Sequence, residues 1–422
     1  MRKMKDSGLE WLKDVPVTWD VDRLQWHLYE INDKNNPIKT KNVLSLTNKK
    51  GVIPYEQKGA QGNISKENYS EYKIAYKDTI VANSMNILIG SVGYSKYEGC
   101  VSPVYYVFKE KRGTNLNFIN YIMQTTQFQK ELIKYANGIL EIRLRVSVDD
   151  ILKRRVAIPS LKEQNKIVSF LDEKCEKIDY IYKDVEKQIE ILEKYKRSII
   201  TESVIKGLHN NVIYKESNIK WIGRVPAHYN IHPVYYYFKE GNKKNSICSE
   251  TNLLSLSYGK IVRKDINSNG GLLPASFNTY NVVEPGDIII RPTDLQNDKR
   301  SLRTGLVTEH GIITSAYIDL VPKKDVDSKY FHYLLHAYDV MKVFYNMGNG
   351  VRQGLNYSEF SKLLLIEPPL SEQEEIVAYI DRKCAEIDSI IEDKKEQLEI
   401  LEEYKKSLIY EYVTGKKEVP FE

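Results

Sequence analysis

The sequence predicts an α/β protein of mixed α+β type, with two similar globular blocks that are each followed by a long α-helix. The first observation is an internal repeat: PSLKEQ at 159–164 returns as PPLSEQ at 368–373, and LEKYK at 192–196 returns as LEEYK at 401–405. The second is the three-and-four spacing of apolar residues after each Pro-x-Leu-x-Glu-Gln motif. The third is the alternation of short β-rich runs with polar loops in the preceding blocks.

The repeat makes the chain a duplicated unit of about 200 residues, which is too long for a solenoid, whose units run roughly 20–50 residues. Trp11 and Trp221 are equivalent positions near the start of the two copies. The predicted divisions are a first block at 1–158, a first helix at 159–208, a second block at 209–367, a second helix at 368–415 and a tail at 416–422.

Length and composition fit a globular protein with more than one core. The chain has 422 residues, 42% of them hydrophobic, and its apolar runs are far shorter than the ~20 residues that a membrane-spanning helix needs. The charged N-terminal segment is not followed by an apolar stretch, so no secretory signal is expected. Cys175 and Cys384 are equivalent helical positions where a buried apolar role is expected, and no CxxC pair occurs. The expectation is a reducing, cytoplasmic location.

Each block is predicted to mix short strands with helices. The β-rich runs are 42–46, 79–82 and 104–108 in the first block, and 253–256, 287–291 and 316–321 in the second. Each block ends in an amphipathic helix, at 116–136 and at 328–345, followed by an Asn-Gly loop, a short capped helix and a strand. The blocks differ most in their polar loops, as expected for two binding specificities on one frame.

The two segments that begin with the motif are predicted to be long helices. No Gly or Pro interrupts residues 161–206 or 370–414, and the apolar stripe extends over about five heptads. A single helix would expose this stripe, so the two copies are expected to pack on each other. Lys394 stands where the first copy has Val185, and is expected to mark a gap or a contact with a partner. The expected capping boxes are Ser160 with Glu163 and Ser371 with Glu374, and the expected C-terminal caps are Gly207 and Gly415.

Positive charge is concentrated in the globular blocks. Residues 1–158 carry 25 Lys and Arg against 17 Asp and Glu, and residues 209–367 carry 19 against 15. Residues 159–208 are balanced at 10 against 10, and residues 368–422 carry 8 against 15. A polyanion would therefore meet the blocks before the helices, which favours nucleic acid as a partner.

No sequence motif for catalysis or nucleotide binding is found. The chain has no GxxxxGK[ST] phosphate loop, no GxSxG elbow and no kinase signature set. His332 and His336 are one helical turn apart but lack the Glu of HExxH, so a structural role is favoured over zinc binding. Asp149 and Asp150 are interpreted as the acidic first turn of a helix rather than a catalytic pair. Glu367-Pro-Pro-Leu lacks the aromatic residue of the Asp-Pro-Pro-aromatic motif of amino-methyltransferases, and is interpreted as a helix entry.

Polar loops that follow the β-rich runs carry the residue types that read DNA bases. Arginine donates bidentately to guanine, and asparagine or glutamine pairs with adenine. The loop at 291–303 is the richest in these types, and a solvated surface position is the alternative for any single residue. The candidate DNA-binding residues are Lys49, Lys50, Lys58, Gln61, Asn63, Asn83, Ser84, Asn86, Arg143, Arg145, Tyr258, Lys260, Arg263, Lys264, Arg291, Gln296, Asn297, Lys299, Arg300, Arg303, Arg352 and Gln353.

The whole chain resembles the specificity subunit of type I restriction–modification enzymes. The resemblance rests on the paired Pro-x-Leu-x-Glu-Gln motifs and on the Val-x-[FY]-[LI]-Asp runs that follow them at 168–172 and 377–381. The N-terminal signature with two tryptophans, Trp11 and Trp19, also matches. The second copy is weaker there because Tyr229 replaces the second tryptophan.

The resemblance implies two target-recognition domains, each reading one half of a split, asymmetric sequence in double-stranded DNA. It also implies that the two helices pack antiparallel as a coiled-coil-like spacer with a pseudo-two-fold repeat, and that they dock two methyltransferase subunits. S-adenosylmethionine, ATP and Mg would be bound by partner chains, the methyltransferase and the restriction/translocase subunits of a prokaryotic cytoplasm. This chain itself would be non-catalytic.

Two other function classes remain as alternatives. One is a self-contained DNA methyltransferase or nuclease with a diverged site, which an S-adenosylmethionine fingerprint would favour; none is present. The other is a helical scaffold that does not bind DNA, which would be expected to have neutral globular blocks. The positive charge of both blocks favours DNA binding.

Overall fold

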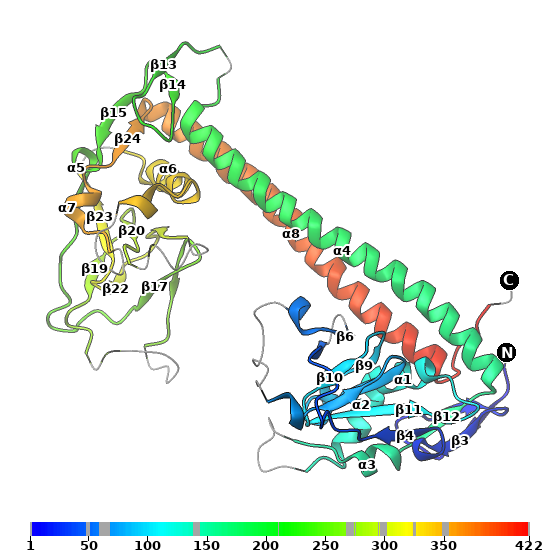
Figure 1. Ribbon diagram of the computed structural model, residues 1–422. Helices are drawn as coiled ribbons and strands as arrows, with labels where there is room; N and C mark the ends of the chain where they lie inside the picture. The colour runs from blue at the N-terminus through cyan, green and yellow to red at the C-terminus, as the bar shows by residue number, and fades with distance from the viewer. Residues whose placement is uncertain are drawn as a thin grey trace. The chain divides into compact units, whose positions relative to one another are not determined.

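The computed structural model describes residues 2–47, 51–58, 68–137, 144–209, 211–266, 274, 276–293, 295, 302–323, 326–347 and 354–420. The chain forms two compact units, residues 1–186 with 395–422, and residues 187–394. Each unit holds one globular block and part of each long helix (Figure 1).

A four-stranded antiparallel sheet lies at the centre of the first unit. Its order is β4 (Leu28–Ile31), β11 (Tyr105–Glu110), β8 (Thr79–Asn83) and β9 (Val92–Ser95). The strand pairs around it are β1 (Met4–Asp6) with β2 (Asp14–Pro16), β3 (Asp20–Arg23) with β12 (Arg155–Ile158), β5 (Leu44–Thr47) with β6 (Gly51–Pro54), and β7 (Lys73–Ala75) with β10 (Gly99–Val101).

The second unit repeats this arrangement strand for strand. Its central sheet has the order β16 (Phe238–Glu240), β23 (Ile318–Pro322), β20 (Ile288–Ile290) and β21 (Thr304–Leu306). The internal duplication predicted from the motifs is therefore a duplication of topology as well. The accompanying pairs are β13 (Tyr214–Glu216) with β14 (Arg224–Pro226), β15 (Asn230–Pro233) with β24 (Leu364–Glu367), β17 (Leu254–Ser257) with β18 (Lys260–Arg263), and β19 (Asn281–Val283) with β22 (Gly311–Ile313).

Short helices cover the sheets, and two long helices pass through both units. The long helices are α4 (Leu161–Lys206) and α8 (Leu370–Val413). No described helix is both long enough and apolar enough to cross a membrane. The short α-helices are α1 (Leu116–Gln124), α2 (Thr126–Ile133), α3 (Val148–Leu152), α5 (Val234–Tyr237), α6 (Ser328–Val340) and α7 (Tyr357–Phe360), and the 3-10 turns are η1 (Leu24–Trp26), η2 (Tyr55–Lys58), η3 (Tyr69–Glu71), η4 (Ile87–Ile89) and η6 (Val343–Asn346).

Both predicted amphipathic helices end earlier than expected. The helix predicted at 116–136 is broken at Thr125, which has extended backbone angles and caps α2 with its side chain. Its hydroxyl also donates to the carbonyl of Ile122, so local side-chain bonding competes with helix continuation. The helix predicted at 328–345 ends at Val340, because Lys342 adopts a left-handed conformation with φ of 62°.

The N-terminal cap of the first long helix is confirmed in part, and that of the second is wrong. Ser160 Oγ accepts from the backbone N–H of Glu163 at 3.4 Å, whereas the Glu163 carboxylate pairs with Arg2 instead of closing the box. Helix α8 begins at Leu370, so Ser371 lies inside its first turn. The carbonyl of Pro369 starts this helix by accepting from the N–H of Gln373 at 3.0 Å. The predicted C-terminal caps Gly207 and Gly415 are confirmed, each with φ of 70°.

The long helices pack antiparallel in both units, as expected. In the first unit Lys405 Nζ lies 2.6 Å from Asp179, and the Phe170 and Tyr412 rings are 4.6 Å apart. In the second unit Lys196 Nζ lies 2.6 Å from Asp388. Lys394 donates to Gln188 of α4, so it contacts the neighbouring helix rather than marking a gap. Cys175 and Cys384 are buried in the helix packing, as predicted.

Candidate nucleic-acid interface

Three loops come together beside the central sheet of the first unit. The β8–β9 hairpin is closed by the N–H of Asn83, which donates to the carbonyl of Ser91 at 3.0 Å. The segment after α2 joins this hairpin where the N–H of Val146 donates to the carbonyl of Ser84 at 3.1 Å. The β5–β6 hairpin lies against strand β9, and the Cα of Gly51 is 3.1 Å from the point where a Cβ on Gly93 would lie.

The same three loops come together in the second unit. The β20–β21 hairpin is closed by the N–H of Arg291, which donates to the carbonyl of Arg303 at 2.8 Å. The N–H of Leu355 donates to the carbonyl of Pro292 at 3.0 Å, which joins the segment before α7 to this hairpin. At the β17–β18 turn, a Cβ on Gly259 would lie 3.0 Å from Leu302 Cδ1. The loops that the sequence singled out separately are therefore neighbours in space in each unit.

A glycine in the sheet makes each of these arrangements possible. A Cβ on Gly305 in β21 would lie 2.6 Å from Leu256 Cδ1 of the β17–β18 hairpin. Gly93 in β9 is its counterpart and would place a Cβ 3.1 Å from Leu46 Cδ1. Such a close approach needs a residue without a side chain. We call each group of three loops a reading surface, and define it by its described residues. These are 47, 51, 83–91, 137 and 144–146 in the first unit, and 257–260, 291–293, 295, 302–303 and 354–355 in the second.

Several candidate residues on or next to these surfaces are accessible among the described residues. Tyr258 is 81% exposed at the tip of the β17–β18 hairpin, where its φ of 46° is unusual for a residue other than glycine or asparagine. Arg291 is half-buried at the base of its loop. Lys58 is half-buried with its Nζ 5.2 Å from the Tyr55 ring centroid. Asn86, Arg145, Lys260, Arg263 and Lys264 are exposed.

Arg263 is held by a surface ion pair. Its guanidinium contacts the Glu309 carboxylate, which also accepts from Asn252 Nδ2 at 3.3 Å. The pair raises the pKa of Arg263 and lowers the pKa of Glu309. A phosphate or base would have to compete with this carboxylate, so Arg263 is a weaker candidate than its exposure suggests.

Three of the candidate DNA-binding residues are buried, which argues against direct DNA contact by their side chains in this conformation. Arg303 has no exposed surface, and its guanidinium donates to the carbonyl of Thr293 at 2.6 Å. Asn83 is 7% exposed and accepts from the N–H of Met85, and Ser84 is 4% exposed. These residues shape their loops instead of presenting side chains to a ligand.

The remaining candidates lie outside the described residues, so their prediction stays a prediction. They are Lys49, Lys50, Gln61, Asn63, Arg143, Gln296, Asn297, Lys299, Arg300, Arg352 and Gln353.

The sequence located the repeated glutamine of the motif but not its structural role. Gln164 is 1% exposed; its Oε1 accepts from the N–H of Asn115 at 2.7 Å, and its Nε2 donates to the carbonyl of Pro159 at 2.9 Å. Gln373 makes the equivalent bonds to the N–H of Asp327 at 3.1 Å and to the carbonyl of Pro368 at 2.9 Å. Asn115 caps α1 and Asp327 caps α6, so each glutamine links a long helix to the start of a block helix.

The aspartate of the second motif forms a further link between the same elements. Tyr121 of α1 donates its hydroxyl to Asp172 of α4 at 2.6 Å, and Tyr333 of α6 donates to Asp381 of α8 at 2.7 Å. Lys329 Nζ also contacts the Asp381 carboxylate, at 2.5 Å. The repeated motifs thus encode how each reading block is fixed to its helix pair.

The residues weighed for catalysis have structural roles in the fold. Ser147 caps α3, and Asp149 and Asp150 form its acidic first turn, as interpreted from the sequence. Burial lowers the pKa of His332 to about 3 and that of His336 to about 4, so both imidazoles are neutral. Among the described residues, no group of three or more His, Cys, Asp or Glu side chains is placed to hold a metal ion.

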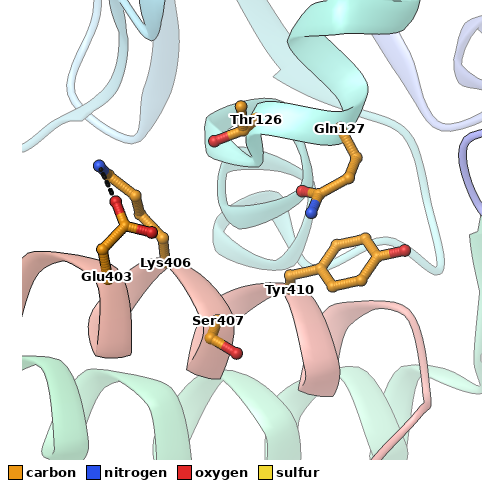
Figure 2. Close-up of a pocket in the computed structure, with 6 residues that line it drawn as sticks. All are labelled: Thr126, Gln127, Glu403, Lys406, Ser407 and Tyr410. Carbon is orange, nitrogen blue, oxygen red and sulfur yellow. Dashed lines mark hydrogen bonds and ion pairs between the residues drawn. The ribbon is translucent and has the colours of Figure 1, made fainter. Parts of the chain in front are cut away.

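One open pocket lies where the start of α2 meets α8 in the first unit. Thr126, Gln127 and Tyr410 are among the side chains that line it, with the Glu403–Lys406 ion pair at its rim (Figure 2). These side chains include no buried acid, base or nucleophile, so the pocket is a surface feature of the helix packing.

Comparison with known proteins identifies related sequences. The family model for the type I restriction modification DNA specificity domain matches residues 16–191 and 308–400. The chain is 25% identical over 296 residues to the putative type I restriction enzyme MjaX specificity subunit of Methanocaldococcus jannaschii, covering 68% of this chain and 65% of that protein. It is 25% identical over 279 residues to the type I restriction enzyme MjaVIII specificity subunit of the same organism, covering 62% of each. The matches therefore span just under two thirds of these relatives.

Two solved structures share the fold. A chain from a study of complex assembly and conformational transition in a type I R-M system matches with a TM-score of 0.68 at 14% identity, covering 96% of this chain and 99% of that one. The HsdS subunit from Thermoanaerobacter tengcongensis matches with a TM-score of 0.50 at 13% identity, covering 96% and 98%. At these identities the likeness concerns the fold alone.

Proposed function

Because the chain belongs to the family of type I restriction modification DNA specificity domains, we propose that it is the chain that selects the DNA sequence in such a system. The observation that carries the proposal is the reading surface that recurs, loop for loop, in the two units. Two similar surfaces with different loops suit a target made of two different half-sites. Each unit would read one half of a split, asymmetric sequence in double-stranded DNA.

The side chains on the second reading surface suit a DNA groove. Tyr258 presents an aromatic ring, Lys260 presents a cation for phosphate, and Arg291 presents a guanidinium that can pair with guanine. The net positive charge of both blocks adds the attraction to phosphate that brings protein and DNA together irrespective of sequence.

The long helices support two equivalent docking sites for a partner. In the first unit Ile400 and Tyr404 are exposed one turn apart on α8, and exposed Ile181 of α4 adjoins Tyr182, whose hydroxyl contacts the intervening Glu402. In the second unit the repeat-equivalent residues, Ile191, Tyr195 and Ile390, are exposed as well.

Matching exposed apolar patches on the two units suit two copies of the same partner. We assign these partners to the methyltransferase subunits, and the distance between half-sites to the paired helices. Removing the side chains of Ile400 and Tyr404 together should weaken one of the two docking events, and removing Ile191 and Tyr195 the other. Analytical ultracentrifugation with the methyltransferase partner would count the copies bound.

We further propose that this chain carries no chemistry of its own. The absence of nucleotide and cofactor motifs from the sequence supports this proposal. S-adenosylmethionine, ATP and Mg would then be bound by the methyltransferase and restriction/translocase subunits. The purified chain should transfer no methyl group to DNA. Robust methylation by the partner-free chain would favour the alternative of a self-contained methyltransferase.

The decisive test of DNA reading is a block exchange. Residues 217–367 replaced by those of a relative should change one half of the methylated motif, read by single-molecule sequencing of genomic DNA, and leave the other half unchanged. A change in both halves would contradict independent reading. If the unmodified complex methylated DNA without any sequence preference, the proposal that this chain selects the DNA sequence would be contradicted.

A further inference from the structure

The β20–β21 loop is closed at its base by the side chain of Arg303. This arginine stands at the end of the loop, and its Nη1 reaches back to the start, donating to the carbonyl of Thr293 at 2.6 Å and lying 3.5 Å from the carbonyl of Arg291. The backbone pair between Arg291 and Arg303 continues the ladder of the two strands. Arg303 thus holds the beginning and the end of this loop together.

Arg303 is also held by residues of α6 and η6. Its backbone N–H donates to Asp339 Oδ2 of α6 at 2.6 Å, and its guanidinium carbon lies 5.3 Å from the Tyr345 ring centroid of η6. Arg303 and Asp339 both have no exposed surface. A charged side chain buried in this way needs fixed partners, so its position is strongly determined.

The first unit closes the corresponding hairpin without an arginine. There the closing pair is Asn83 with Ser91, and the shorter loop is filled by the 3-10 turn η4. The N–H of Gly90 returns to the carbonyl of Ile87 at 3.1 Å. A short loop holds its shape through such local turns. In the second unit the described residues at the base of the loop are joined by the side chain of Arg303.

We propose that Arg303, held by Asp339 and Tyr345, is a positioning residue for the second half-site, which fixes Arg291 and the neighbouring Tyr258 hairpin before DNA is bound. This rests on the proposed function. The connection to the hairpin runs through Leu302, which lies against Gly259, and the connection to the third loop runs through Pro292, which accepts from Leu355. All three loops of the second reading surface thus meet at the base that Arg303 closes.

A positioning role and a direct DNA contact predict different effects for the substitution Arg303→Lys. Arg303→Lys keeps the positive charge but loses the planar fork that reaches Thr293 and stacks over Tyr345. In the complex with its methyltransferase partners, this variant should lose about tenfold or more of the discrimination between the cognate second half-site and single-base changes in it. The first half-site should keep its discrimination. The salt dependence of binding should not change, because a buried side chain releases no counterion from DNA.

Two further variants make the comparison sharp. Tyr345→Leu removes the ring beside the guanidinium and leaves its hydrogen bonds, so it should relax the same half-site to a smaller degree. Arg224→Lys is the matched control, because this exposed arginine of the same unit also donates to a carbonyl, that of Tyr214. The control should read both half-sites as the unmodified chain does. An Arg303→Lys chain with unchanged melting temperature and unchanged discrimination would overturn the proposal.

If Arg303→Lys lowers the melting temperature, hydrogen exchange in the unmodified complex tests whether the loop base is closed before DNA is bound. The amide hydrogens of Arg291, Arg303 and Leu355 should exchange slowly with solvent both without DNA and with it, because the loop base is already closed. Rapid exchange that becomes slow only on DNA binding would overturn the proposal. Failure of the proposed function has a different signature: the unmodified complex would then show no sequence preference, whatever the exchange rates.

Discussion

Gln164 and Gln373 show how one buried side chain can serve two purposes at a junction. Each amide accepts from a backbone N–H at the start of a block helix and donates to the carbonyl of a motif proline. A leucine has a similar volume but can do neither. The repeated glutamine of the motif is therefore explained by hydrogen bonding at the point where the reading block meets the long helix.

Gln373→Leu should lower the free energy of unfolding by about 2 kcal/mol, because the N–H of Asp327 and the carbonyl of Pro368 lose their partner in a buried place. Thermal unfolding followed by circular dichroism measures this. Glu374→Ala changes the next residue, which is exposed, and should stay within about 0.5 kcal/mol. Equal melting temperatures for the two variants would show that the amide is not needed.

Asp319 gives the second unit a pH dependence of stability opposite in sign to that of a carboxylate whose pKa is lowered by an ion pair. It is 2% exposed in β23, and burial, with the nearby charges of Asp287 and Glu240, raises its pKa to about 7. The folded chain then holds this proton more tightly than the unfolded chain. The resulting stabilisation is full below the unfolded pKa of about 4 and is lost as the pH rises to about 7.

Asp319→Asn should therefore gain stability relative to the unmodified chain as the pH rises from 5 to 8, by on the order of 2 kcal/mol, because asparagine cannot ionise. Melting temperatures of both chains across this range give the comparison. Asp265→Asn changes an exposed carboxylate of the same unit and is the control for the loss of a surface charge. A difference between Asp319→Asn and the unmodified chain that is constant with pH would show that Asp319 stays ionised in the fold.

At the scale of elements, hydrophobic spacing predicted the long helices α4 and α8 closely, because their stripes extend without interruption over many turns. It predicted α1 and α6 to be longer than they are, because the apolar spacing continues past Thr125 and Lys342, whose backbone angles are not helical. The three loops of each reading surface were named from sequence, yet their meeting depends on strand pairing that no local pattern contains. The burial of Arg303 could not be predicted, because a sequence does not distinguish a buried arginine from an exposed one.

The hairpins that carry Tyr258 and Gly51 depend on glycines in the sheet beneath them. Gly305→Val would place side-chain atoms where Leu256 and Ile261 of the β17–β18 hairpin now lie. The hairpin should lift from the sheet, and the second half-site should be read with about tenfold less discrimination. Methylome sequencing would record it as a degenerate half-site.

Gly93→Val in the first unit is the matched variant, because Gly93 supports the β5–β6 hairpin in the same way. It should relax the first half-site and leave the second intact, the mirror image of Gly305→Val. If either glycine variant affected both half-sites equally, the hairpins would be acting on overall stability rather than on reading.

At the scale of the whole molecule, the duplication gives each unit the same components in the same chain order. Each unit has a reading surface, a glutamine junction and an exposed apolar patch on the helix pair. Each unit also contains part of both long helices, so neither block is attached by a single strand of chain. We infer that the continuous helices, rather than the partners, set the distance between the half-sites.

Insertion of four residues near Lys187 tests this inference. Four residues are about one helical turn, so the apolar face stays roughly in phase and the helix grows by ~6 Å. DNA rises ~3.4 Å per base pair, so the spacer between the half-sites should grow by one or two base pairs while both half-sites stay the same. Methylome sequencing of cells that carry the variant gives the new spacer directly.

A matched insertion in α8 completes the design. Gln188 of α4 contacts Lys394 of α8, so four residues inserted near Lys395 restore the pairing that a single insertion leaves one turn out of register. The double insertion should give the same longer spacer with higher activity, because the apolar stripes of both helices again match. A spacer that stayed unchanged in an active complex with both insertions would show that the methyltransferase partners, and not the helices, hold the half-sites apart.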